Sequence, residues 1–204
     1  MSHMNRSDGP GRRAILAGLP AALCGGLALR HAMRPRPASA AETETDPARL
    51  PPQVGDRFAY YYGDRKGEIL TLADVPESRD QQLVYPLDPE TGELRNGTRL
   101  NMVMLLRLDA AGFDAQTRAN AAEGVVCYSA VCTHQGCPVV DWKTENNSFI
   151  CECHGSQFDP TAAARVLDGP APRPLAMLPI AIEGERQEVV VAGAFTRPVG
   201  GQRG

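Results

Sequence analysis

The chain has 204 residues, enough for one domain of ordinary size with a hydrophobic core and terminal extensions. Only 5% of the residues are aromatic, while 20 Gly and 17 Pro favour a loop-rich β architecture over a helical bundle. The formal net charge of −3 becomes −8 for residues 41–204, because residues 1–40 hold six Arg and one Asp. This acidity gives no support for nucleic-acid binding and predicts attraction to basic partners.

Residues 1–40 have the pattern of an export signal. Arg12 and Arg13 precede an apolar run over residues 14–29, and a basic stretch then ends in small residues near Ala40. The paired arginines indicate the twin-arginine route, which predicts a periplasmic protein. The alternative is a retained anchor in the inner membrane, although sixteen apolar residues with three Gly and one Pro are short for about 30 Å of hydrocarbon.

The rest of the chain predicts one domain between a linker and a tail. Residues 41–52 are polar and Pro-rich, as is typical of a linker. Residues 53–195 form the predicted domain, and the Gly-rich residues 196–204 are expected to be a flexible tail.

The predicted elements of the domain are mostly strands. They occupy residues 58–62, 67–72, 83–85, 101–108, 124–129, 175–183 and 188–192, and Asn96-Gly97 is a hairpin signal. Residues 114–123 break this pattern and predict a short surface helix that Asp114 caps and Gly124 ends. Cys127 is expected to be a buried free thiol in its strand.

Two short stretches hold both of the histidines that follow residue 40. The first is AVCTHQGCP at residues 130–138, and the second is FICECHGSQFD at residues 149–159. The spacing Cys132-x-His134 and Cys151-x-x-His154 puts a thiolate and an imidazole in each of two loops, so that both loops can share a metal centre. Zinc accepts the same four ligands. Each stretch holds one further cysteine, which a zinc site would leave unexplained and which can bridge the loops in an exported protein.

CTHQGC and CECHGSQFD resemble the two boxes of the Rieske iron–sulfur proteins, which occur in cytochrome bc-type complexes and related systems. The resemblance covers residues 124–192 and implies an all-β fold of small antiparallel sheets with cluster-binding loops at one end. It also implies one [2Fe-2S] cluster per chain. The implied roles are two sulfur ligands to one iron, two imidazole ligands to the other and a disulfide between the loops: Cys132 with Cys151, His134 with His154, and Cys137 with Cys153.

The resemblance extends to residues that would surround the cluster. Ser156 stands where the family's serine donates a hydrogen bond to a bridging sulfide. Phe158 stands where high-potential members have a tyrosine, so one hydrogen-bond donor is missing and an intermediate potential is expected; alternatively, Phe158 only packs. The family's proline loop, which covers the cluster from a third side, matches Gly169, Pro170, Ala171 and Pro172.

The resemblance implies a periplasmic protein that transfers one electron at a time, with oxidoreductase activity only as part of a complex. Three assignments compete. A subunit of a bc-type quinol oxidoreductase, anchored by its retained signal, agrees with Ser156 and the GPAP loop. The small subunit of an arsenite-oxidase-type molybdenum enzyme agrees with VVCYSAVCTHQGCP and Phe158. The third is a stand-alone carrier.

The implied partners are a c-type cytochrome or a large catalytic subunit, with quinol as a candidate donor. A Rieske oxygenase needs a second iron held by two histidines and a carboxylate, and no histidine remains for it after His134 and His154. A structural zinc module is the non-redox alternative.

Overall fold

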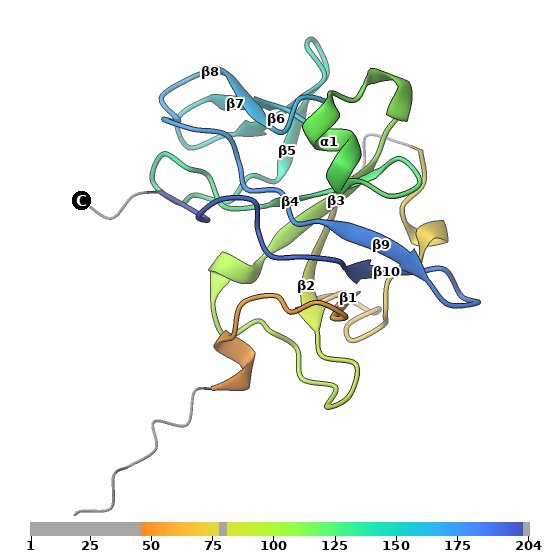
Figure 1. The fold of residues 1–204 in the computed structure, drawn as a ribbon. Coiled ribbons are helices and arrows are strands. Elements are labelled where there is room, and N and C mark those ends of the chain that lie inside the picture. Colours follow the sequence, from red (N-terminus) through yellow and green to blue (C-terminus); the bar gives the residue numbers. More distant parts are fainter. Residues whose placement is uncertain (1–45, 78–80, 202–204) are drawn as a thin grey trace, which may run out of the picture. The chain divides into compact units, whose positions relative to one another are not determined.

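The structure, a computed structural model, describes residues 46–77 and 81–201, so the export-signal prediction for residues 1–40 lies outside it. The described chain consists mainly of antiparallel sheets joined by loops and short helices (Figure 1), which confirms the predicted all-β class. No helix in these two ranges combines the length and the apolar character that a membrane crossing needs.

The larger sheet has six strands in the order β4-β3-β2-β1-β10-β9. Their bounds are β1 (Arg57–Ala59), β2 (Gln82–Leu87), β3 (Val103–Arg107), β4 (Val125–Ser129), β9 (Ile180–Glu183) and β10 (Glu188–Val191). The smaller sheet has the order β5-β6-β7-β8, with β5 (Asp141–Lys143), β6 (Ser148–Cys151), β7 (Ser156–Asp159) and β8 (Arg165–Asp168). The helices are η1 (Pro47–Arg49), η2 (Leu72–Asp74), η3 (Arg99–Asn101), η4 (Ala110–Gly112) and α1 (Ala115–Asn120).

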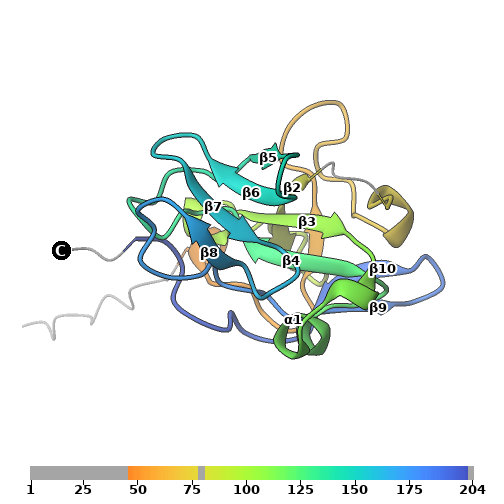
Figure 2. The ribbon, with the colours of Figure 1, turned by 90° about the horizontal axis from the view of Figure 1, so that it is seen from above.

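Strands β3 and β4 are buried on both faces, because successive side chains of a strand point to opposite sides. Met104 and Tyr128 pair across the two strands and face one buried cluster, while their neighbours Leu105 and Cys127 pair and face the other. The first cluster also contains Phe149 of the smaller sheet. The smaller sheet therefore packs on β3 and β4, as Figure 2 shows from above.

The structure confirms most of the predicted elements. Strands occur at the predicted positions around residues 83–85, 101–108, 124–129 and 188–192, while the strands predicted for 58–62 and 175–183 are shorter, as β1 and β9. Asp114 caps α1 as expected, since its Oδ1 accepts a hydrogen bond from the Thr117 amide at 2.6 Å. The strand predicted for residues 67–72 is wrong, because that segment makes only isolated bridges through Ile69 and Thr71.

The hairpin predicted at Asn96-Gly97 is also wrong, and tertiary contacts explain why. The preceding Arg95 is 5% exposed and forms a bidentate ion pair with buried Asp56, at 2.6 and 2.9 Å. Gly97 donates its amide to Ala48 O at 2.9 Å and lies so close to η1 that a β-carbon would be 2.7 Å from Arg49 Cγ. The dipeptide therefore serves the packing of η1 instead of a two-strand turn.

Both segments that flank the predicted domain are attached to it within the described ranges. From residue 46 onward the predicted linker contacts the domain, since Leu50 O accepts a hydrogen bond from Asn101 Nδ2 at 2.7 Å. Residues 196–201, predicted as part of a flexible tail, instead hydrogen-bond to the domain: Thr196 N donates to Met177 O at 2.9 Å, and Arg173 Nη1 donates to Pro198 O at 2.5 Å.

Candidate metal centre

The first box forms a tight loop directly after β4. The Cys132 amide donates to Cys137 O at 2.8 Å, and the Gly136 amide donates to Cys132 O at 2.9 Å, so the loop closes on itself. The Cys132 side chain points into the protein and is 1% exposed, whereas His134 at the loop tip is half-buried. The loop thus presents one sulfur from the core side and one imidazole nearer to the surface.

The second box is the connection between β6 and β7. Cys151, the last residue of β6, is paired in register with Ser156, the first residue of β7, and the Gly155 amide donates to Cys151 O at 2.9 Å. Gly155 has φ +73°, a conformation that glycine adopts without steric cost, and this lets the chain reverse within four residues. Cys151 is therefore buried at a strand end, while His154 is exposed on the turn.

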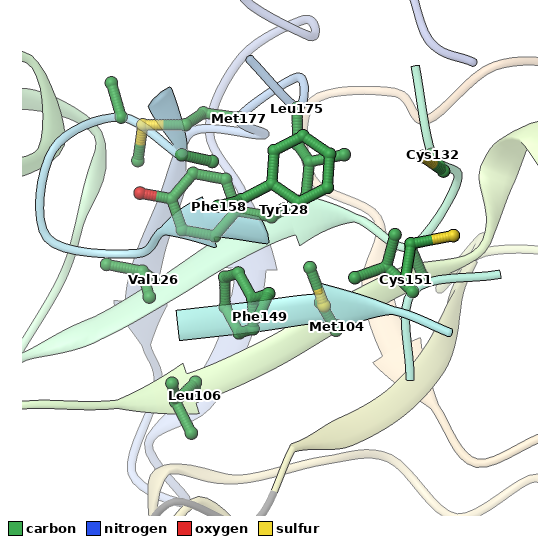
Figure 3. Close-up of a cluster of buried hydrophobic side chains, with 14 of the residues drawn as sticks. Met104, Leu106, Val126, Tyr128, Cys132, Phe149, Cys151, Phe158, Leu175 and Met177 are labelled. Atoms are coloured by element: carbon green, nitrogen blue, oxygen red, sulfur yellow. The ribbon is translucent and has the colours of Figure 1, made fainter. Parts of the chain in front are cut away.

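The two boxes converge. The rings of His134 and His154 lie with centroids 4.6 Å apart and nearly perpendicular, at 88°. Cys137 and Cys153 form a disulfide between the loops, and the sulfurs of this disulfide lie within 4.8 Å of Cys151 Sγ. Figure 3 shows Cys132 and Cys151 together at one edge of the buried cluster of apolar side chains. The sequence-predicted residues of both boxes are thus collected at one place.

The GPAP segment, residues 169–172, is tied to both boxes. The Ala171 amide donates to Ser156 Oγ at 3.1 Å, and Thr133 Oγ1 of the first box donates to Arg173 O at 2.6 Å. Gly169 is required by this approach, since its φ is +84° and a β-carbon there would lie 2.6 Å from Ser156 Cα. Sequence reasoning missed Thr133, which lies between Cys132 and His134 and is 1% exposed. A threonine in a loop gives no sign in the sequence that its side chain is buried.

Phe158 packs in the core beside the two buried cysteines of the boxes. It is fully buried in the same cluster as Cys132 and Cys151. The hydroxyl-bearing side chain of that cluster is Tyr128, whose Oη donates to Pro160 O at 2.8 Å and points away from the cysteines (Figure 3). Neither aromatic ring therefore offers a hydroxyl hydrogen bond to the cysteine sulfurs.

Comparison with known proteins identifies the family. The model of the Rieske [2Fe-2S] domain matches residues 90–179. A cytochrome bc1 complex Rieske iron–sulfur subunit of Streptomyces lividans is 33% identical over 115 residues, which cover 56% of this chain and 67% of that protein. The chain belongs to the Rieske [2Fe-2S] family.

Other Rieske relatives are matched over smaller parts of their length. The subunit of the same name from Corynebacterium glutamicum is 36% identical over 49% of this chain and 26% of its own, so the chain spans about a quarter of that relative. A protein from Haloferax mediterranei, named as a respiratory nitrate reductase Rieske subunit, is 38% identical over 53% of this chain and 48% of its own. The soluble domain of Rieske protein II from Sulfolobus acidocaldarius has a TM-score of 0.38 at 15% identity, over 59% of this chain and 72% of that domain.

The residues present fit the family's [2Fe-2S] cluster. His134 Nδ1 is buried without a hydrogen-bond partner in the described ranges, although buried polar atoms are normally satisfied. Burial, together with the neighbouring Cys132, raises the pKa of the Cys151 thiol. A bound metal compensates both costs, since it takes the nitrogen lone pair and stabilises a thiolate. Cys127 is a different case, because its burial raises the pKa of a thiol on the opposite face of β4.

Proposed function

We propose that this Rieske domain transfers single electrons through a [2Fe-2S] cluster held by Cys132, Cys151, His134 and His154. The observation that carries this proposal is the meeting of two imidazoles, one with an unpartnered buried Nδ1, beside two buried thiols. Such a cluster supplies a one-electron acceptor at about −150 to +300 mV, against about −400 mV for plant-type clusters.

The mixed ligand set explains this potential. Two ferric ions, two sulfides and two thiolates sum to zero charge, whereas four thiolates would leave the oxidised site at −2. An electron is added more easily to a neutral site. Neutral imidazoles at His134 and His154 are therefore the residues that make the centre a mild oxidant.

The protein side chains divide the remaining tasks. The exposed His154 and half-buried His134 give the electron a short path to the surface, and Cys132 and Cys151 join the centre to the core. Ser156 Oγ accepts from the Ala171 amide, which leaves its proton free for a sulfide, and such a bond stabilises the reduced form. Since Phe158 has no hydroxyl, the midpoint potential is expected below that of tyrosine-bearing relatives.

The decisive test is spectroscopic. The holoprotein should contain two irons and two acid-labile sulfides per chain and, after reduction with dithionite, show the low-average-g paramagnetic signal of a histidine-ligated centre. His134→Cys should lower the midpoint potential or lose the cluster, while Cys127→Ser, which changes a buried thiol away from the boxes, should keep the signal. A colourless protein that holds zinc would refute the proposal.

We also propose that the domain works as an exported subunit or carrier with a c-type cytochrome or a large catalytic subunit as partner. The bc1 names of the Streptomyces and Corynebacterium relatives support a quinol-oxidising complex, and the nitrate reductase name of the Haloferax relative supports a different catalytic partner. Mass spectrometry of the native N-terminus distinguishes an anchored subunit from a soluble subunit or carrier. Cleavage near Ala40 indicates a soluble subunit or carrier, and a retained segment indicates the anchored subunit.

A further inference from the structure

Apart from Arg118 on α1, four arginines form no ion pair in the described ranges. Six other arginines in these ranges do pair with a carboxylate: Arg57, Arg65, Arg95, Arg107, Arg165 and Arg186. The four, which we call the arginine face, are Arg49, Arg99, Arg173 and Arg197. In Figure 1 their segments follow one side of the domain, from the dark blue C-terminal loop past η3 to η1.

Arg99 lies against the loop that carries His134. A β-carbon at Gly136 would be 3.0 Å from Arg99 Nη2, so the guanidinium rests over the first box. Arg99 and His134 both line a cavity of about 430 Å³, together with Gly136, Gly200 and Gly201. Among the residues that the structure describes, no Asp or Glu lines this cavity. The charge of Arg99 therefore lies beside the half-buried imidazole of His134, with no described carboxylate in the cavity to neutralise it.

Two more cations are associated with the C-terminal segment: Arg173, which binds it, and Arg197, which belongs to it. The guanidinium of Arg173 donates to the carbonyls of Pro198 and Gly200, which fixes this segment without neutralising the charge. The segment then reaches the first box itself, because a β-carbon at Gly201 would lie 2.6 Å from His134 O. Arg197 lies within this fixed stretch.

The arginine face adjoins apolar surface. Arg197 lines a second cavity, of about 560 Å³, with Pro51, Pro52, Val54 and Phe195, and Val54 is 74% exposed. Within the described part of the chain, no Asp or Glu lines this second cavity either. Arg49 ends η1, two residues before Pro51. Arginine beside exposed apolar side chains is the composition that protein interfaces favour.

The sign of this face is opposite to that of the whole chain. Residues 41–204 carry a formal −8, yet among the described residues no Asp or Glu lines the cavity of Arg99 or the cavity of Arg197. Since salt screens exposed charges beyond about 8–10 Å, a partner that approaches His134 meets this local field. The basic partner expected from net charge would be repelled at this edge.

We propose that the arginine face docks a carboxylate-rich surface of the redox partner protein, which brings that partner to the His134 edge. This proposal rests on the proposed electron transfer. Charge complementarity of this kind acts mainly on the rate of encounter and on the choice of partner. In the transfer step one electron leaves the reduced centre and reduces the partner's cofactor by one.

The first test measures the sign of the local field with the full-chain holoprotein. Oxidation of the dithionite-reduced protein by hexacyanoferrate(III), an anion, should slow as ionic strength rises, whereas oxidation by the cation tris(phenanthroline)cobalt(III) should not. Arg99→Gln with Arg197→Gln should slow the anionic reaction about tenfold at low ionic strength. The control Arg118→Gln with Arg186→Gln, at two positions outside both cavities, removes the same two charges elsewhere, and neither it nor Arg186→Gln alone should change the rate much.

The second test measures binding directly by isothermal titration with hexaglutamate. The Arg99→Gln/Arg197→Gln pair should weaken binding about tenfold, and Arg186→Gln should not. If hexaglutamate binds the double variant as tightly as the unchanged protein while the low-average-g signal persists, the docking proposal fails and the electron-transfer proposal stands. Preferential binding to phosphatidylglycerol vesicles would overturn the proposal and show that the arginine face binds a membrane instead of a partner protein. If the protein self-associates and the double variant does not, the arginine face binds a second copy of the chain instead of a partner protein.

Discussion

The two faces of β3 and β4 are made by the same two strands but support different parts of the molecule. The face toward Leu70 and Phe58 is a purely apolar core apart from one inert thiol, Cys127. The face toward Phe149 and Phe158 is equally buried, but its cluster includes Cys132 and Cys151. Packing on the first face determines stability alone, whereas packing on the second also determines where the sulfurs lie.

Beyond the second face, a few polar and covalent links replace apolar packing. One disulfide joins the two boxes, and two hydrogen bonds, through Thr133 and Ser156, attach them to the GPAP segment. The region that holds the centre is therefore fixed by few individual interactions. Each of these can be removed separately, and the effects should differ from those of core truncation.

The largest effect is expected from a matched pair of core truncations. Leu70→Ala should lower the free energy of unfolding by about 2–5 kcal/mol and Phe158→Ala by about 3–5 kcal/mol, because both side chains are fully buried. Only Phe158→Ala should also shift the midpoint potential and the paramagnetic g values. Guanidinium titration and redox potentiometry measure the two quantities, and a potential shifted equally by both variants would break the comparison.

Removal of the disulfide comes next. Cys137→Ser with Cys153→Ser opens a loop with a sequence separation of 16 residues, which is worth about 3 kcal/mol in the chain-entropy model. Unfolding should become easier, and a chelator should remove iron faster, because the loops lose their link. Cys127→Ser is the control for cysteine loss away from the boxes. Unchanged iron release would show that hydrogen bonds alone hold the loops.

Ser156→Ala tests the polar link on the second box. The variant leaves the Ala171 amide without its acceptor, which should cost about 1–3 kcal/mol. It also removes the proposed bond to sulfide, so the midpoint potential should fall. Ser148→Ala is the matched control, since Ser148 is also fully buried but bonds to Asn146 at the end of β6 opposite to Cys151. A lowered potential in both variants would contradict the assigned role.

The smallest effect concerns Asp159 at the end of β7, and it depends on pH. Burial opposes ionisation, but hydrogen bonds from Thr161 and the Arg165 ion pair outweigh it and lower the pKa of Asp159. Its stabilisation is present above the unfolded-state pKa, near about 4, and is lost as the pH falls through the lower folded-state value.

Asp159→Asn should therefore cost about 1 kcal/mol at neutral pH, and this difference should shrink in acid. Guanidinium unfolding of both proteins at several pH values measures it. Asp64→Asn, at an exposed position with no hydrogen bond or ion pair in the described ranges, should show no such trend. A difference that persists unchanged in strong acid would exclude the charge as its source.

The sequence predicted the site better than the larger sheet. The two boxes are local in sequence, each forms a loop closed by its own backbone hydrogen bonds, and their resemblance to the Rieske boxes implied which residues meet. The buried run over residues 101–108 was equally readable, because β3 is apolar on both faces.

Contacts between distant residues account for what the sequence did not show. Asn96-Gly97 has a hairpin sequence, but the Arg95–Asp56 ion pair and the contact of Gly97 with η1 override it. Residues 196–201 have a tail-like composition, yet Arg173 holds them through two carbonyls. No local pattern reveals either contact, and the acidic net charge similarly concealed the arginine face.

The alternation along β4 has a consequence for how the centre is assembled. Cys127 and Tyr128 are adjacent in sequence but belong to opposite clusters. A shift of one residue in the pairing of β4 with β3 would exchange the two faces and bring the wrong thiol toward the second sheet. The native register therefore keeps the free thiol of Cys127 on the face of the sheet opposite to the cluster that contains Cys132 and Cys151.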